Sequence, residues 1–232
     1  MKTLIIDTST KTASVAVFED KMLLGEFVLN TPLTHSQKLM PMVESLLGML
    51  DLKVRDFDLM IACEGPGSFT GVRIGLSTVK AFAQPFGIPV VTETSLSLLA
   101  GAFPRFEGII LSMLDAKRNE VYYGVMRWEG NKLVKLEEDV EEISLLLDRV
   151  TKAYPEESIV LVGDALEVYE STIEPFIKFP NLKLASGVQN VPRASQFSYL
   201  IESESTRLGY LDVKANYMRK SQAERDLKRK DA

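Results

Sequence analysis

Residues 65–75 read Gly-Pro-Gly-Ser-Phe-Thr-Gly-Val-Arg-Ile-Gly, the most specific stretch of the chain. An apolar run at 59–63 precedes it, and apolar residues at helical spacing follow it through residue 86. A strand, a glycine-rich turn and a helix in this order point backbone N–H groups and the positive end of the helix dipole at the space above the turn. The lysine and hydroxyl of a P-loop are missing, and the glycines do not have dinucleotide-binding spacing. The stretch therefore predicts a strand–turn–helix unit without specifying its chemistry.

The glycine-rich turn admits two interpretations. In the first, the N–H groups of residues 68–71 bind an anion such as a nucleotide phosphate. The candidate anion site is then Gly67, Ser68, Thr70 and Gly71. In the second, which we favour, the glycines allow a tight turn and close helix packing. Gly71, Gly75 and Thr78 then form a flat stripe for a neighbouring helix, and Arg73 is a nearby surface charge.

Composition and charge limit the classes of function. The net charge of the 232-residue chain is −5, which argues against a protein that grips nucleic acid by itself. One cysteine, Cys63, and one histidine, His35, exclude an internal disulfide and a zinc site of paired His or Cys, whereas a carboxylate site for magnesium stays open. The first residues do not resemble a signal peptide, and no apolar run approaches the roughly 18 residues of a membrane span. We expect a cytoplasmic protein without membrane contact.

The same order of predicted elements occurs twice, as three strands, helix, strand, helix, strand and helix. The first copy has strands at 2–7, 13–19, 21–29, 58–63 and 89–91 and helices at 35–50, 70–86 and 94–102. The second has strands at 109–114, 120–127, 132–136, 159–162 and 182–184 and helices at 143–150, 166–177 and 193–207. This repeat predicts a duplicated α/β fold of actin-like (ASKHA, ribonuclease H-like) domains, with mixed sheets and flanking helices. The predicted lobes are 1–103, with the docking helices, and 104–232, smaller, with a C-terminal helix and basic tail.

An ATPase or kinase of this architecture uses two phosphate hairpins that usually read Asp-x-Gly, because glycine lets the backbone approach the phosphates. Here the hairpins read Asp7-Thr8-Ser9 and Asp115-Ala116-Lys117, so neither has the glycine, and Gly163 is followed by Asp164 instead of a second glycine. We interpret Asp7 and Asp115 as turn residues. Cys63 is expected to be a buried side chain, since no second histidine can act as its base. No catalytic residue or metal site is predicted; an ATPase or small-molecule kinase with magnesium on Asp7 and Asp115 is the alternative.

Four motifs resemble the TsaB (YeaZ) family. They are Asp7-Thr8-Ser9 with Thr12, Thr34-His35-Ser36 with Leu39 and Pro41, the stretch 65–75, and Asp115-Ala116 with Glu120-Val121-Tyr122. The likeness covers most of the chain and is weakest between about residues 130 and 190. It implies a non-catalytic subunit required for N6-threonylcarbamoyladenosine formation in tRNA. The implied partners are a TsaD-like catalytic subunit, a TsaE-like ATPase, a second copy of the chain when alone, and tRNA only indirectly.

The predicted helix 35–50 has apolar residues on more than one narrow stripe, which fits either a buried core helix or a partner surface. The resemblance favours docking, because it implies that the first two helices pair with those of a TsaD-like subunit. The predicted interface comprises His35, Leu39, Met40, Val43, Leu47, Gly71, Gly75 and Thr78. A charge at Leu39 or Val43 is accordingly expected to abolish partner binding and leave the fold intact. No cofactor is expected, with ATP or ADP at a subunit junction as an alternative.

Residues 214–230 form a basic tail with seven lysines and arginines against Glu224 and Asp226. A solvated tail is the common explanation of such a run, and contact with tRNA phosphates inside a complex is a second. Residues 217–219 could instead lie back on the first half. We assign this tail no function.

Overall fold

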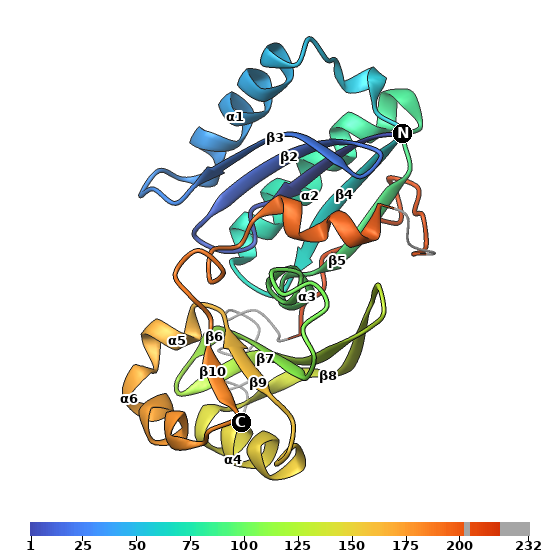
Figure 1. Ribbon diagram of the computed structural model, residues 1–232. Coiled ribbons are helices and arrows are strands. Elements are labelled where there is room, and N and C mark those ends of the chain that lie inside the picture. The colour runs from blue at the N-terminus through green and yellow to red at the C-terminus, as the bar shows by residue number, and fades with distance from the viewer. Residues whose placement is uncertain (202–204, 219–232) are drawn as a thin grey trace.

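The computed structural model describes residues 1–201 and 205–218, which form two lobes, each built on a five-stranded mixed sheet (Figure 1). The first sheet has the order β3-β2-β1-β4-β5, with β1 (Lys2–Asp7), β2 (Ala13–Glu19), β3 (Met22–Leu29), β4 (Leu59–Gly65) and β5 (Val90–Thr94). The second has the order β10-β9-β6-β7-β8, with β6 (Ile109–Lys117), β7 (Glu120–Glu129), β8 (Lys132–Glu142), β9 (Ile159–Val162) and β10 (Leu182–Leu184). The first three strands of each lobe are antiparallel and the later ones parallel to the first. This equivalent order confirms the duplicated actin-like fold.

Helices cover both faces of the first sheet. On one face α1 (His35–Met49) and α2 (Phe69–Ala83) share a core with the sheet, and α3 (Ser95–Ala100) lies on the other. Short 3-10 turns, η1 (Val54–Asp56) and η2 (Gln84–Phe86), follow α1 and α2. Polar cap residues precede both long helices: the Thr34 N–H donates to Gln37 Oε1 at 3.0 Å, and Ser68 Oγ accepts from the Gly71 N–H at 3.1 Å.

The second lobe departs from the predicted helices in two places. Its outer face is covered by α4 (Ile143–Ala153), α5 (Ala165–Val168), α6 (Glu170–Ile173) and the 3-10 helix η3 (Glu174–Lys178). The single helix predicted at 166–177 is therefore wrong: the chain leaves helical geometry at Tyr169, and Pro175, which has no N–H to donate, stands at the start of η3. The helix predicted at 193–207 is also wrong in its described residues: η4 (Ala194–Leu200) is a 3-10 helix, and residues 205–207, which precede the pairing of Leu208 with β5, are not helical.

The C-terminal part of the chain returns to the first lobe. In Figure 1 η4 crosses the face of the first sheet opposite α1 and α2, where Ala194, Phe197 and Leu200 are buried. The Arg193 guanidinium donates to the buried Glu26 carboxylate at 2.8 Å and holds this segment in place. Residues 194–200 and Leu208, which the predicted boundaries assign to the second lobe, therefore pack on the first, whereas the division at 103 stays a prediction. Lys214 and Tyr217 of the basic tail are described; from Arg219 on the tail lies outside the described residues.

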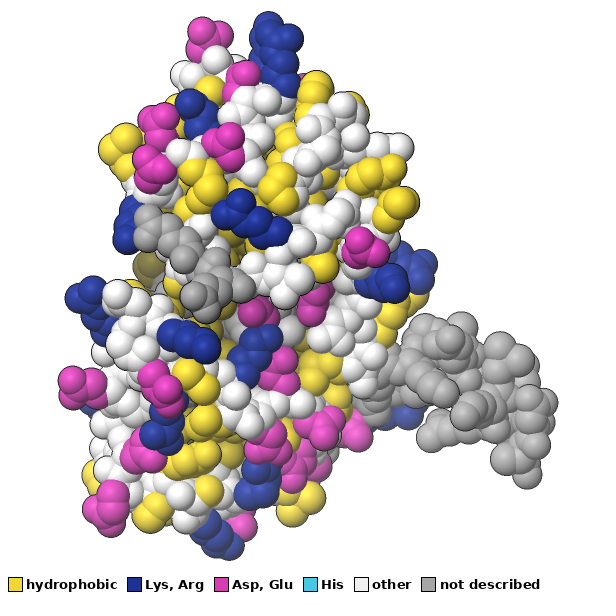
Figure 2. Space-filling model, turned by 90° about the vertical axis from the view of Figure 1, so that its right-hand side faces the viewer, with side chains coloured by type: hydrophobic (Ala, Val, Ile, Leu, Met, Phe, Trp, Pro, Cys, Tyr) yellow, Lys and Arg dark blue, Asp and Glu magenta, His cyan; other side chains and the backbone are white. Residues whose placement is uncertain are grey.

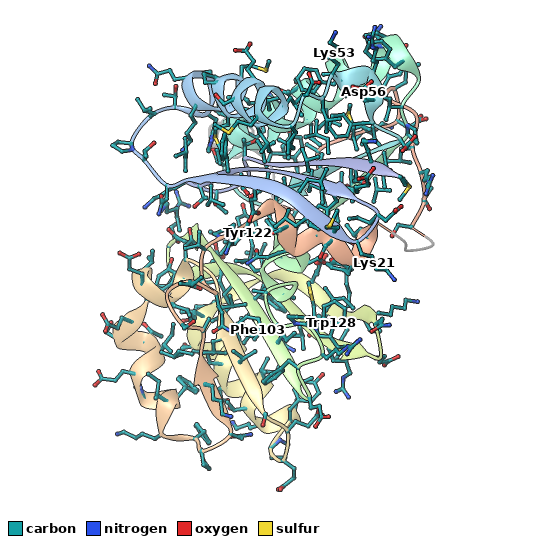
Figure 3. The ribbon with its side chains drawn as sticks, turned by 45° about the horizontal axis from the view of Figure 1, so that its top comes forward. Lys21, Lys53, Asp56, Phe103, Tyr122 and Trp128 are labelled. Carbon is teal, nitrogen blue, oxygen red and sulfur yellow. The ribbon has the colours of Figure 1, made fainter. Side chains whose placement is uncertain are left out.

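The two lobes share an apolar contact centred on α3. Leu96, Leu99 and Ala100 pack against Ile110 and other residues of the second sheet's inner face. Figure 3 shows Phe103 and Trp128 on the second-lobe side of this contact. A packed apolar core of this kind resists relative displacement of its elements, so it fixes the space between the lobes. No helix among the described residues is long and apolar enough to cross a membrane.

Candidate functional site

A cleft of about 920 Å³ opens between the lobes and is the candidate site. The β1–β2 hairpin, the segment before α1 and the glycine loop line it from the first lobe, and the β6–β7 hairpin lines it from the second. Figure 3 shows Tyr122 at the boundary of the two lobes. The lining residues include Ser9, Lys11, His35, Gly67, Ser68, Thr70, Ile74, Asp115, Lys117, Tyr122 and Asp164.

In the first hairpin the carboxylate of Asp7 turns inward. Asp7 is fully buried, and its Oδ1 accepts the Ser9 N–H at 2.9 Å, which closes the turn as predicted. Burial raises the pKa of Asp7, and its Oδ2 has no hydrogen-bond partner among the described residues. Cys63 is buried beside it, and the pKa of its thiol is raised well above the usual range by burial. The floor of this hairpin is thus occupied by buried, inward-facing groups.

In the second hairpin Asp115 is occupied by its own lobe. Its Oδ1 accepts the Lys117 N–H and the Tyr169 hydroxyl, both at 2.7 Å, and its Oδ2 pairs with the Lys117 ammonium. Burial acts to raise the pKa of Asp115, but the hydrogen bonds and charge from Lys117 and Tyr169 lower it overall. Asp164 accepts the Asp115 N–H at 2.9 Å, and burial raises the pKa of Asp164. Asp115 therefore also acts as a turn residue.

The glycine loop wraps around the first hairpin. The Ser68 N–H donates to the Ser9 carbonyl at 2.7 Å, and the Gly71 N–H donates to Ser68 Oγ. Two of the N–H groups of the candidate anion site are thus used within the chain, although Gly67, Ser68 and Thr70 do line the cleft. An anion there would lack those two donors, which weakens the anion interpretation.

The small-residue stripe of α2 faces inward, so the predicted partner contact at Gly71 and Gly75 is wrong. A Cβ at Gly71 would lie 2.1 Å from the Thr8 carbonyl oxygen, and one at Gly75 would lie 2.5 Å from Thr8 Oγ1. The Thr8 hydroxyl donates to the Gly71 carbonyl at 2.8 Å. Thr78 is half-buried and donates to Ile74 of its own helix. The stripe therefore receives the β1–β2 hairpin.

The predicted α1 interface divides between core and surface. Leu39, Val43 and Leu47 are buried against the first sheet, which corrects their assignment to a partner surface. Met40 is exposed, and half-buried His35 bonds through Nε2 to the Thr10 carbonyl at 2.7 Å. Met49, which lies beyond the apolar stripe and widens the apolar surface of this helix, is 76% exposed.

The buried carboxyl of Asp7 predicts a pH-dependent effect of Asp7→Asn. Because the folded-state pKa lies above the unfolded value of about 4, the native state holds its proton more tightly. The contribution of Asp7 to the stability of the wild type is therefore lost as pH rises through its raised pKa. The variant does not share this loss, because asparagine cannot ionise. We expect the stability of the variant relative to wild type to increase from pH 4 to pH 7 in urea unfolding. Asp148→Asn on exposed α4 is the control, and a relative stability that falls with pH would contradict the assignment.

Comparisons with known proteins agree with the architecture. The family model described as TsaD, tRNA N6-adenosine threonylcarbamoyltransferase, matches residues 30–204. The tRNA threonylcarbamoyladenosine biosynthesis protein TsaB of Bacillus subtilis is 28% identical over 226 residues, covering 97% of this chain and 96% of that protein. The TsaB protein of Escherichia coli is 33% identical over 133 residues, covering 56% of this chain and 57% of its own length.

Among solved structures, YeaZ from Pseudomonas aeruginosa has a TM-score of 0.75 at 24% identity, covering 93% of this chain and 99% of its own. Another structure from that organism, with the same TM-score of 0.75, is of a protein described as similar to peptidase YEAZ. These likenesses show the fold. The family model covers more than half of the chain and the B. subtilis relative nearly all of it. The chain therefore belongs to the TsaD-type family, and it is similar over nearly its whole length to a TsaB protein.

Proposed function

We propose that the chain is a non-catalytic subunit required for N6-threonylcarbamoyladenosine formation in tRNA, where it binds and activates a TsaD-like catalytic subunit. The observation that supports this most is the near full-length likeness to a protein named for threonylcarbamoyladenosine biosynthesis. A TsaE-like ATPase joins the pair, and tRNA is reached through the partner. Without the partner, a second copy of the chain covers the surface that the TsaD-like subunit would otherwise cover. The complex works in the cytoplasm.

The polar groups of the cleft form hydrogen bonds within the chain, which supports a subunit that performs no chemistry of its own. Asp7 closes its own turn, and Asp115 is bound by Lys117 and Tyr169. Burial keeps the Cys63 thiol protonated, because it raises the pKa of that thiol. Activation is therefore proposed to be structural: the docked surface holds the catalytic subunit in its active form.

The exposed surface of α1 is the proposed docking face. Met40 and Met49 lie on different sides of the helix, next to its buried stripe, with 38% and 76% of their surfaces exposed, and Leu33 just before the helix is 53% exposed. Flexible methionine side chains suit a surface that meets more than one partner. Large apolar side chains gathered on one exposed helix mark an interaction surface more often than isolated ones do.

We expect the double variant Met40→Glu/Met49→Glu to lose binding of the TsaD-like subunit. Two charges on the docking face must be desolvated on association, so co-purified partner should fall by about tenfold or more. Melting temperature should stay close to wild type, because both side chains are exposed. Val188→Glu, at an exposed position of the second lobe, is the matched control. Undiminished co-purification would exclude this face.

The alternative, an ATPase or small-molecule kinase, is favoured by the size of the cleft alone. Calorimetry with ATP and magnesium on the isolated chain separates the two functions. We expect no micromolar binding. Micromolar binding that Asp7→Ala abolishes would support the enzyme, whereas binding that appears only with the TsaD-like subunit present would place the nucleotide at the subunit junction.

A further inference from the structure

Residues 208–217, the C-terminal strap, are fastened along the edge of the first lobe. Leu208 exchanges two backbone hydrogen bonds with Val90 of β5, at 2.7 and 2.9 Å. Val213 is buried in the first-lobe core, and its carbonyl accepts from Lys80 Nζ at 3.0 Å. The Asn216 N–H donates to the Glu64 carbonyl at 2.8 Å, directly before the glycine loop. The strap therefore delivers Tyr217 to the first turn of α2.

Tyr217 completes a cluster with two residues of α2. The Arg73 guanidinium carbon lies 3.8 Å from the centre of the Phe69 ring, and Arg73 Nε donates to the Tyr217 hydroxyl at 2.8 Å. The two rings are 5.0 Å apart. Phe69 and Tyr217 remain 41% and 46% exposed, and Arg73 is exposed as well. Ring and hydroxyl together fix the plane of the guanidinium at the surface.

We infer that Phe69, Arg73 and Tyr217 form an anchor that binds a carboxylate of the protein partner. The inference rests on the proposed function and adds a second contact to the α1 face. Within residues 1–201 and 205–218 no carboxylate pairs with Arg73, and the Nε bond leaves its terminal nitrogens for a bidentate acceptor. A guanidinium fixed in advance loses little freedom on binding. Tyrosine and arginine are enriched among the residues that dominate interface energies.

The cluster is continuous with the docking side of the first lobe. Thr70 and Ile74 directly follow Phe69 and Arg73 along α2 and line the mouth of the cleft. Helix α2 shares the same face of the first sheet with α1 (Figure 1). A partner that covers α1 and the cleft mouth therefore reaches Arg73 without leaving the first lobe.

The surroundings favour a single protein carboxylate over the phosphates of RNA. Glu64 lies beside the strap and belongs to a group of three acidic side chains, since both Glu64 and Glu93 act electrostatically on Glu138. Among the described residues, Lys135 alone forms ion pairs with this acidic group. A polyanion would be repelled by this group, whereas one carboxylate meets Arg73. On the face shown in Figure 2, acidic side chains lie among the basic ones over both lobes.

Calorimetric titration of the full chain with the TsaD-like subunit tests the anchor. Arg73→Lys keeps the charge and loses the planar fork, and we expect affinity to fall by about tenfold. Tyr217→Phe keeps the ring and loses the acceptor that orients Nε, with an expected loss of about threefold or more. The control, Arg55→Lys at an exposed position of η1, should bind like wild type. All variants should melt close to wild type.

A charge exchange identifies the bound group. Arg73→Glu should abolish binding, and one Asp→Arg or Glu→Arg variant of the TsaD-like subunit should restore it. An affinity of Arg73→Lys within twofold of wild type would overturn the anchor while leaving the proposed function standing. Gel-shift titration with unmodified tRNA adds the RNA outcome: if Arg73→Lys weakens tRNA binding and spares partner binding, the carboxylate assignment is overturned. If wild type itself fails to bind the subunit, the proposed function fails, and the anchor with it.

Discussion

Leu39→Glu is expected to unfold the first lobe, not merely to detach a partner. Leu39 is 1% exposed and packs from α1 onto the core of the first sheet. Glutamate there loses the apolar packing and buries a carboxylate that has no partner. We expect a destabilisation of at least about 4 kcal/mol, which approaches the whole stability of many domains. Circular dichroism during heating, or recovery of soluble protein, measures it.

The neighbouring position supplies the matched control. Met40 is 38% exposed, so Met40→Glu should change the free energy of unfolding by no more than about 0.5 kcal/mol. Adjacent residues of one helix thus separate loss of fold from loss of partner binding. A Leu39→Glu protein that melts with wild type and fails only to bind would restore the sequence-based interface and contradict the packing described here.

Gly71→Ala is expected to destabilise the protein by about 3 kcal/mol. The new Cβ would lie 2.1 Å from the Thr8 carbonyl oxygen and 3.0 Å from His35 Cδ2. Since the first of these is a backbone atom, α2 and the β1–β2 hairpin must move apart, and the Thr8–Gly71 hydrogen bond must lengthen or break. Urea unfolding gives the change in free energy.

The control for this prediction is Gly48→Ala near the end of α1. A Cβ at Gly48 meets no atom within 4 Å, so alanine should stabilise the helix by up to about 1 kcal/mol. The same substitution in two helices of one lobe is therefore expected to have opposite signs. Equal stability of Gly71→Ala and wild type would show that the hairpin does not press on the stripe.

The fold could be predicted from the local sequence pattern, because apolar periodicity and helix caps depend on residues that are close together in the sequence. Thr34 and Ser68 start α1 and α2, and the equivalent strand orders follow from the repeated element order. The two wrong helices have different causes. Pro175 is a local helix breaker that apolar periodicity does not register, whereas the pairing of Leu208 with β5 is a tertiary contact that draws the chain after η4 to the first sheet.

The sequence predicts which residue types form the candidate site, but it does not predict which way their side chains face. Glycines at 71 and 75 signal a close approach, but only the fold shows that the approaching group is Thr8, far away in the sequence. The wide apolar arc of α1 likewise leaves open whether Leu39 or Met40 faces the sheet. Tyr217 has no periodic signal at all, because the strap that positions it is irregular.

The chain is proposed to support tRNA modification without catalysing it. The most direct measurement is the rate of N6-threonylcarbamoyladenosine formation by the TsaD-like subunit with its TsaE-like ATPase, with no added chain, with wild type, or with Asp7→Asn/Asp115→Asn. We predict that formation requires the chain and that the double variant sustains the wild-type rate. A double variant that binds the subunit like wild type yet fails to support formation would contradict a non-catalytic role of the chain.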